Sequence, residues 1–192
     1  MALKKTKSII HGGKRVSEIL EAHQLFFSGK DGGIRADLSG ANLSGADLSG
    51  MNLSGALLQN ANLEGANLRR AKLPHVDLGG ANLRKADLRN TDLTEANLSG
   101  ANLEQAQASG VEFFRCDLRN TNFQRALLRN ANFRLANVNG AKFSGADMGV
   151  TILRETDLTG ADLSGVDLST TLLPRNFTSE KSTSAKADSN SA

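Results

Sequence analysis

Few residues in this sequence have side chains that could do chemistry. Three histidines and one cysteine are the candidate metal ligands and nucleophiles, and the aspartates are candidate acids or bases. His23 falls on an apolar helical stripe and His75 follows a proline, and neither has partners at metal-site spacing. Cys116 stands where alanine recurs every five residues, so we expect a buried, unreactive thiol. The aspartates recur at the same interval, which indicates a structural role. We predict no enzymatic activity and no catalytic, metal-binding or cofactor-binding site.

That five-residue interval organises most of the chain. The segment Ala-Asp-Leu-Ser-Gly at 36–40 is followed by Ala-Asn-Leu-Ser-Gly at 41–45, and the pattern continues without insertion. Taking the Leu position as the centre, centres fall every five residues from Leu38 to Leu173, which gives 28 units. Of these centres, 21 are Leu and four are Phe. A repeat this regular determines the fold class before any other feature.

The spacing of the apolar residues predicts a coil with corners. Apolar positions alternate in steps of two and three, which fits neither a helix nor an ordinary strand. A step of two is a short extended segment, and a step of three requires a turn. Glycine two residues after the centre suits that turn, because it adopts backbone angles that other residues avoid. The chain should therefore wind into coils that pair their backbones about 4.8 Å apart.

The unit resembles that of the pentapeptide-repeat family: a small residue, Asn or Asp, Leu or Phe, a polar residue and Gly. The resemblance implies an all-β solenoid, a right-handed quadrilateral β-helix with four units per coil. Residues 36–175 would then form seven coils, a stack roughly 34 Å tall. The resemblance also implies a binding or scaffold module without catalysis.

A coil of 20 residues would stack side chains that lie 20 positions apart. Several such pairs are complementary, and Arg69 over Arg89 is the exception. The complementary sets are Glu64–Arg84–Glu104, Lys72–Asp92, Glu95–Arg115, Phe113–Phe133 and Phe123–Phe143. The four phenylalanines would form a core stack, and their bulk would compensate for the small centre Ala108.

The two ends differ from the repeat. Residues 1–14 are basic and are expected to be mobile, and residues 176–192 lack an apolar pattern and are expected to be disordered. Residues 15–35 are predicted to form a capping helix and a turn that cover the first coil. The helix would begin at an N-cap, Ser17, and bury one stripe. That stripe consists of Ile19, Leu20, His23, Phe26 and Phe27.

Two surfaces are candidate interaction sites. Residues 69–134 hold 11 basic and seven acidic side chains, so a face there could meet an anionic partner or be merely a solvated, charge-mixed surface. Its members are Arg69, Arg70, Lys85, Arg89 and Arg129. At the C-terminal coil, Ile152, Leu172 and Phe177 are apolar. We expect either a homodimer through that end or folding of Phe177 over the core.

The function indicated is a protein–protein interaction or scaffold rod in the bacterial cytoplasm, with an unknown partner. No apolar run approaches the roughly 20 residues that a transmembrane helix needs. The family resemblance offers an alternative, because some members mimic DNA, bind DNA gyrase and protect it from quinolones. Residues 36–175 hold 14 basic and 15 acidic side chains, which disfavours a DNA mimic. Nucleic acid is not expected as a partner, because the set of basic residues shows no aromatic interleaving for base stacking. A bacterial effector or a membrane-associated protein is the third alternative.

Overall fold

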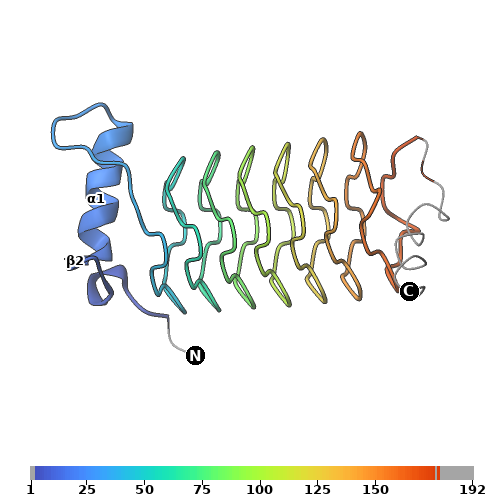
Figure 1. The fold of residues 1–192 in the computed structure, drawn as a ribbon, viewed down its shortest axis with the longest axis horizontal. Helices are drawn as coiled ribbons and strands as arrows, with labels where there is room; N and C mark the ends of the chain where they lie inside the picture. The colour runs from blue at the N-terminus through green and yellow to red at the C-terminus, as the bar shows by residue number, and fades with distance from the viewer. Residues whose placement is uncertain (1–2, 176, 178–192) are drawn as a thin grey trace, which may run out of the picture.

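The repeats wind into a rod of stacked coils (Figure 1). The computed structural model describes residues 3–175 and 177. Parallel bridges join residues that are 20 positions apart, from the pair Asp37–Leu57 to the pair Ile152–Leu172. The bridges are isolated, so each face of a coil is a very short extended segment and not a long strand. The register of 20 gives four units per coil, as the sequence predicted.

Each coil is joined to the next by backbone hydrogen bonds in both directions. The amide of Leu38 donates to the carbonyl of Leu57 (2.8 Å), and the amide of Leu57 donates to the carbonyl of Ala36 (3.0 Å). The same pairing recurs on all four faces. Because every coil satisfies its neighbour's backbone groups, the rod needs no long strands to stay stacked.

The core consists of the centres and the small residues two positions before them. The centres from Leu38 to Leu153 are almost completely buried, and so are the alanines that precede them. Burying one leucine contributes roughly 1.5–3 kcal/mol before the entropy cost. The core is therefore a continuous apolar column along the rod.

Buried threonines cross-link this column in a way the sequence did not predict. Thr91, Thr121 and Thr151 replace the inner alanine, and each hydroxyl donates to a centre's carbonyl 23 residues earlier, at 2.7–3.0 Å. Cys116 occupies the equivalent position, and its sulfur lies 2.8 Å from the carbonyl oxygen of Leu93. Burial raises the pKa of the Cys116 thiol to about 12, so the thiol stays protonated and unreactive at neutral pH.

The four phenylalanine centres form the expected stack. Phe113 lies over Phe133 with ring centroids 4.7 Å apart, and Phe123 lies over Phe143 at 5.0 Å. The two columns meet edge-to-face across the core, with Phe113 and Phe123 5.6 Å apart. Ala108 is buried beside this wider part of the core. The rings thus supply bulk where one centre is small.

The N-terminal residues form a compact cap. The cap, residues 3–35, contains the short helix η1 (Thr6–Ser8), the hairpin of β1 (Ile10–His11) and β2 (Lys14–Arg15), and the helix α1 (Val16–Phe27). Lys4 pairs with the first coil, since its amide donates to Gly45 (2.7 Å) and its carbonyl accepts from Asp47 (2.9 Å). The described part of residues 1–14, for which mobility was expected, is thus paired with the first coil. The backbone edge of the first coil gives that segment hydrogen-bond partners.

Helix α1 lies across the open end of the rod, and Ile19 and Leu20 pack on the core. The helix begins at Val16 with Arg15 as its N-cap residue, so the predicted N-cap at Ser17 is wrong. The side chain of Glu18 explains the earlier start, because its Oε2 accepts a hydrogen bond from the amide of Arg15 (3.1 Å). The predicted disordered tail lies almost wholly outside the described residues.

His23 is the buried polar residue that joins the helix to the first coil. Its Nδ1 accepts a hydrogen bond from the amide of Ala36 (3.1 Å), and its Nε2 has no partner among the described residues. Burial, assisted by the nearby charge of Arg35, lowers the pKa of His23 below its ordinary value, although the Ser54 backbone opposes the shift. The neutral imidazole is therefore the form that holds the cap.

We predict that the cap loses stability in mild acid. Below the ordinary histidine pKa of 6.5 the unfolded chain takes up a proton at His23 that the folded chain resists, so stability falls as the pH drops. Thermal unfolding between pH 7.5 and pH 5 would show a falling Tm for the wild type. In the variant His23→Asn, whose side-chain oxygen can accept the Ala36 amide, the fall should be smaller. An equal fall in both proteins would contradict the role of His23.

Candidate interaction surface

The corners of the coils are where the structure departs most from a uniform repeat. The last residue of most units has a positive φ, as glycine readily allows. Among the described residues, fourteen other than glycine adopt the same conformation, with φ between 55° and 62°. In an L-amino acid this left-handed conformation costs roughly 1–2 kcal/mol, and asparagine tolerates it best. A corner residue other than glycine or asparagine therefore marks a position where the backbone is strained.

Corner residues that lie 20 positions apart form four edges along the rod, and two of these edges contrast sharply. One edge carries only Gly and Asn, namely Gly40, Asn60, Gly80, Gly100, Asn120, Gly140 and Gly160. Another carries five successive residues that are neither. We call these five residues the corner ridge: His75, Glu95, Arg115, Leu135 and Glu155. All five are exposed, so this edge projects large side chains into solvent.

Weak interactions connect the side chains of the corner ridge. Glu95 lies between His75 (Nδ1–Oε2, 3.4 Å) and Arg115 (Nη1–Oε1, 3.5 Å). The guanidinium of Arg115 lies 5.2 Å from the ring centroid of Phe114. Exposed ion pairs of this kind contribute at most about 1 kcal/mol. Glu155 also accepts a two-point hydrogen bond from Arg134 (2.9 and 3.0 Å). These exposed pairs at most balance the backbone strain of the corner residues, so the fold gains little from these side chains.

The predicted arginine face is largely neutralised. Arg69, Arg89 and Arg129 share one face, as expected, but Arg89 forms a two-point hydrogen bond with Asp87 (2.6 and 2.9 Å). Arg69 also approaches Asp87 (3.9 Å), and this shared carboxylate separates the two like charges that the sequence placed 20 residues apart. Although burial opposes the shift, hydrogen bonds from Arg89 hold the pKa of Asp87 below its ordinary value.

The remaining members of the predicted basic set lie at the margins of that face. Arg70 and Lys85 are exposed corner residues on different edges, and neither forms an ion pair with a described residue. Arg129 approaches Asp147 at 3.3 Å. The structure thus brings the five residues near one face but leaves only two of them without acidic partners among the described residues.

Of the other predicted ladders, one forms the expected ion pairs and one pairs through the backbone only. Arg84 bridges Glu64 (2.9 Å) and Glu104 (3.7 Å). Lys72 lies opposite Asp92 in the backbone ladder without a side-chain ion pair between them. Ile152 and Leu172 are bridged neighbours on the outer surface, and Leu172 is exposed. Phe177 packs against the core, which corresponds to the folded-back alternative at the C-terminal end.

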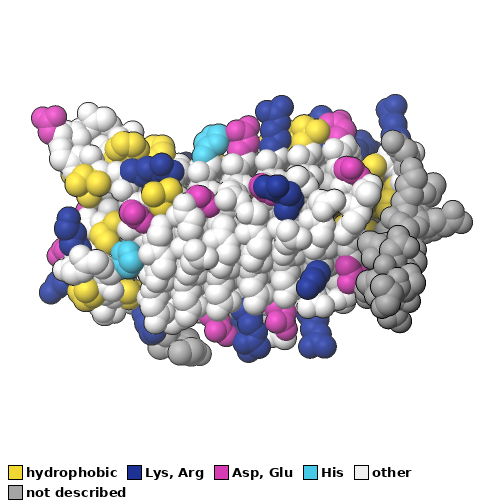
Figure 2. All heavy atoms as spheres, in the orientation of Figure 1, with side chains coloured by type: hydrophobic (Ala, Val, Ile, Leu, Met, Phe, Trp, Pro, Cys, Tyr) yellow, Lys and Arg dark blue, Asp and Glu magenta, His cyan; other side chains and the backbone are white. Residues whose placement is uncertain are grey.

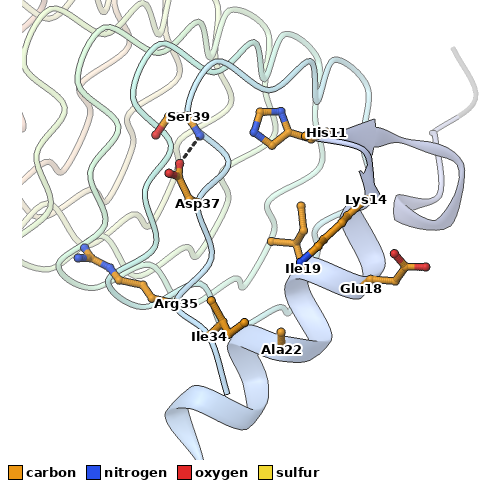
Figure 3. A pocket seen from close by; sticks show the side chains of 10 residues that line it. His11, Lys14, Glu18, Ile19, Ala22, Ile34, Arg35, Asp37 and Ser39 are labelled. Atoms are coloured by element: carbon orange, nitrogen blue, oxygen red, sulfur yellow. Dashed lines mark hydrogen bonds between the residues drawn. The ribbon is translucent and has the colours of Figure 1, made fainter. Parts of the chain in front are cut away.

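The structure supplies a groove but no constellation for chemistry in the part of the chain it describes. The groove has a volume of about 380 Å³ and lies between the cap and the first coil (Figure 3). Ile19 and Ile34 line it together with the basic residues His11, Lys14 and Arg35. Among residues 3–175 and 177, no group of three His, Cys, Asp or Glu is placed to hold a metal ion. Within the same residues, no helix has the length and apolarity of a membrane span.

Comparisons with known proteins match the repeat region. A family model described as pentapeptide repeats matches residues 36–74, and one described as a pentapeptide repeat region matches residues 66–143 and 86–173. The chain belongs to the pentapeptide-repeat family. Curated proteins compared by sequence give no match.

Comparison with solved structures gives one match that shows the fold and further, weaker matches. A trypsin-treated variant of QnrB1, a plasmid-mediated fluoroquinolone resistance protein, has a TM-score of 0.59 at 21% identity, covering 73% of this chain and 78% of that one. HetL, a regulator of heterocyst differentiation from the cyanobacterium Nostoc sp. strain PCC 7120, has a TM-score of 0.45 at 28% identity. The match to HetL covers 73% of this chain and 86% of HetL. At these identities we take from QnrB1 the fold alone.

The corner ridge is the surface that sequence reasoning missed. The signal was present in the pentapeptide pattern, because these five fifth positions hold His, Glu, Arg, Leu and Glu where glycine is the family's residue. The signal becomes visible only when fifth positions are compared at intervals of 20. Read in order along the chain, the departures look scattered.

We predict that Val150→Gly stabilises the repeat. Val150 is β-branched and half-exposed at φ 58°, a conformation that valine rarely adopts. Removing its side chain should raise the free energy of unfolding by about 1 kcal/mol. The reverse change Gly145→Val, at φ 70° on another edge, should lower it by about 1–2 kcal/mol. Denaturant unfolding of both variants measures this, and a destabilised Val150→Gly would refute the strain argument.

Proposed function

We propose that this pentapeptide-repeat protein is a non-catalytic scaffold, a right-handed β-helix of seven coils that presents its corner ridge to a protein partner. One observation carries the proposal. Five successive corners of one edge hold residues for which a positive φ is unfavourable. Another edge has the same positive φ at its corners but only Gly and Asn there. Strain retained without benefit to the fold is typical of functional surfaces.

The composition of the corner ridge suits a protein interface. It combines an apolar residue, Leu135, with both signs of charge and with Phe114 beside Arg115. Arginine and aromatic side chains are enriched in protein interfaces. A rigid backbone also presents these groups with little loss of entropy on binding.

A gyrase-binding protein is the second candidate, and it rests on the fold shared with the fluoroquinolone resistance protein QnrB1. The near-neutral charge of the repeat segment argues against this candidate. Residues 36–175 carry 14 basic and 15 acidic side chains, whereas a DNA mimic needs a dense negative surface. This candidate would be removed if the protein, at micromolar concentration, neither inhibited gyrase supercoiling nor protected gyrase from a quinolone.

The scaffold proposal predicts that the corner ridge determines partner capture. In the triple variant Glu95→Asn, Arg115→Asn, Leu135→Asn, the large side chains are lost but the left-handed corners remain favourable. Tagged protein expressed in its native cells would be affinity-purified and its partners identified by mass spectrometry. We expect the wild type to recover a protein that the variant loses by at least tenfold, although the variant is as stable as the wild type.

The control replaces the equivalent residues of another edge with asparagine. That variant, Lys85→Asn, Gln105→Asn, Arg125→Asn, removes three corner side chains with the same backbone conformation. It should keep the partner. Equal loss from both variants, or no partner recovered by the wild type, would count against the corner ridge.

The packing of the C-terminal end bears on the oligomeric state. We propose a monomer, since the packing of Phe177 on the core supports the folded-back arrangement over an end-to-end dimer. Light scattering should give one chain per particle for the wild type and for Leu172→Lys. A dimeric wild type that Leu172→Lys converts to a monomer would instead place an interface at Ile152 and Leu172.

A further inference from the structure

The N-terminal cap has a surface unlike that of the repeats. Ten large hydrophobic residues are exposed among the described residues, and six of them belong to the cap. These six are Leu3, Ile10, Leu25, Phe26, Phe27 and Ile34. The other four are spread over the much longer segment 36–175. In Figure 2, hydrophobic side chains accordingly gather at the cap end, and Lys and Arg side chains lie among them.

Four of these residues form an apolar tip at the C-terminal end of α1: Leu25, Phe26, Phe27 and Ile34. The rings of Phe26 and Phe27 are 6.0 Å apart and each is about half exposed. Ile34 is held beside the helix, because its amide donates to the carbonyl of Ala22 (3.0 Å), and it is 60% exposed. Figure 1 shows the end of α1 and the following loop extending beyond the outline of the coils. The apolar tip therefore projects from the rod, and of its four residues Ile34 also lines the groove of Figure 3.

The cap is also the basic part of the chain. Residues 3–35 hold seven Lys and Arg against three Asp and Glu, a net charge of +4, and all seven basic side chains are exposed. The repeat segment 36–175 has a net charge of −1, from 14 basic and 15 acidic residues. Positive charge and exposed apolar area therefore coincide at one end of the rod.

The basic and apolar surfaces are continuous. Ile34 of the apolar tip lines the groove of Figure 3 together with His11, Lys14 and Arg35. Two carboxylates, Glu18 and Asp37, also line it. The amide of Ser39 donates to Asp37 (3.0 Å), so this acidic group is engaged within the first coil. The groove margin of the apolar tip thus carries Lys14 and Arg35 beside two carboxylates, and the excess of positive charge belongs to the cap as a whole.

We infer that the apolar tip docks this protein on an anionic lipid surface. Side chains of Phe, Leu and Ile enter the boundary between head groups and acyl chains, and exposed lysines and arginines are attracted to acidic head groups. A protein partner fits less well, because the cores of protein interfaces are depleted of charge, whereas the tip belongs to a cap with a net charge of +4 and has Lys30 and Arg35 close to it in the chain. Docked in this way, the rod leaves its corner ridge free for a partner.

Vesicle sedimentation of the full-length protein tests the inference. The probes are vesicles of phosphatidylcholine alone and of phosphatidylcholine with about one third phosphatidylserine. We expect at least tenfold tighter binding to the anionic vesicles, weakened by added salt. The variant Phe26→Ser, Ile34→Ser should lose at least tenfold in affinity, and Lys14→Glu, Lys30→Glu should lose the preference for phosphatidylserine.

A matched control removes exposed apolar side chains from the repeats. Leu127 and Val150 are exposed apolar residues of the repeats, and Leu127→Ser, Val150→Ser should bind anionic vesicles as the wild type does. Thermal unfolding would establish that every variant is folded. The inference is overturned if the wild type does not bind anionic vesicles at low salt, binds both lipids equally, or binds unchanged after the apolar tip is altered. Capture of a protein by the apolar tip without vesicle binding would also overturn it.

Discussion

The left-handed corner is the constraint on which the rest of this molecule depends. Each unit makes one turn through a residue of positive φ, and the turn closes with a hydrogen bond such as that from the Ala41 amide to the Leu38 carbonyl (3.0 Å). Four such turns bring the chain back above itself after 20 residues. Only then can the amide of Leu38 meet the carbonyl of Leu57 and the next centre stack in the core. Stacking, burial and surface all follow from the corner.

The corner also separates what the fold requires from what the surface can vary. The inner positions accept only small or apolar residues, because the core column is closed on all four sides. Among the outer positions, the recurrent Asn or Asp accepts a hydrogen bond from the amide two residues later, as Asn52 does from Ser54 (3.1 Å). At the corner, a side chain costs backbone strain. A long side chain at a corner is therefore more informative than the same side chain on a face. The corner ridge is therefore a better candidate for an interaction surface than the arginine face, whose charges are largely paired.

Sequence patterns predicted the repeat well because periodicity alone determines it. The register of 20, the buried centres, the stacking of Phe113 on Phe133 and the outward Asn and Asp positions need no knowledge of tertiary contacts. The N-terminal segment could not be predicted in this way. Its pairing with Asp47 depends on an open backbone edge, which exists only after the first coil has formed. The start of α1 at Val16 likewise depends on one carboxylate, that of Glu18, reaching back to the chain.

The two ends of the rod are covered differently, and this asymmetry bears on how the protein acts. A solenoid must hide the apolar core at each end. At the C-terminal end, among the described residues, a single aromatic residue, Phe177, packs on the core. At the N-terminal end α1 covers the core with Ile19, Leu20 and His23, which uses one side of the helix. Its last turn, Leu25 to Phe27, is not needed for that cover and stays exposed. The cap thus seals the rod and still presents apolar residues outward, as a molecule with one attached end would require.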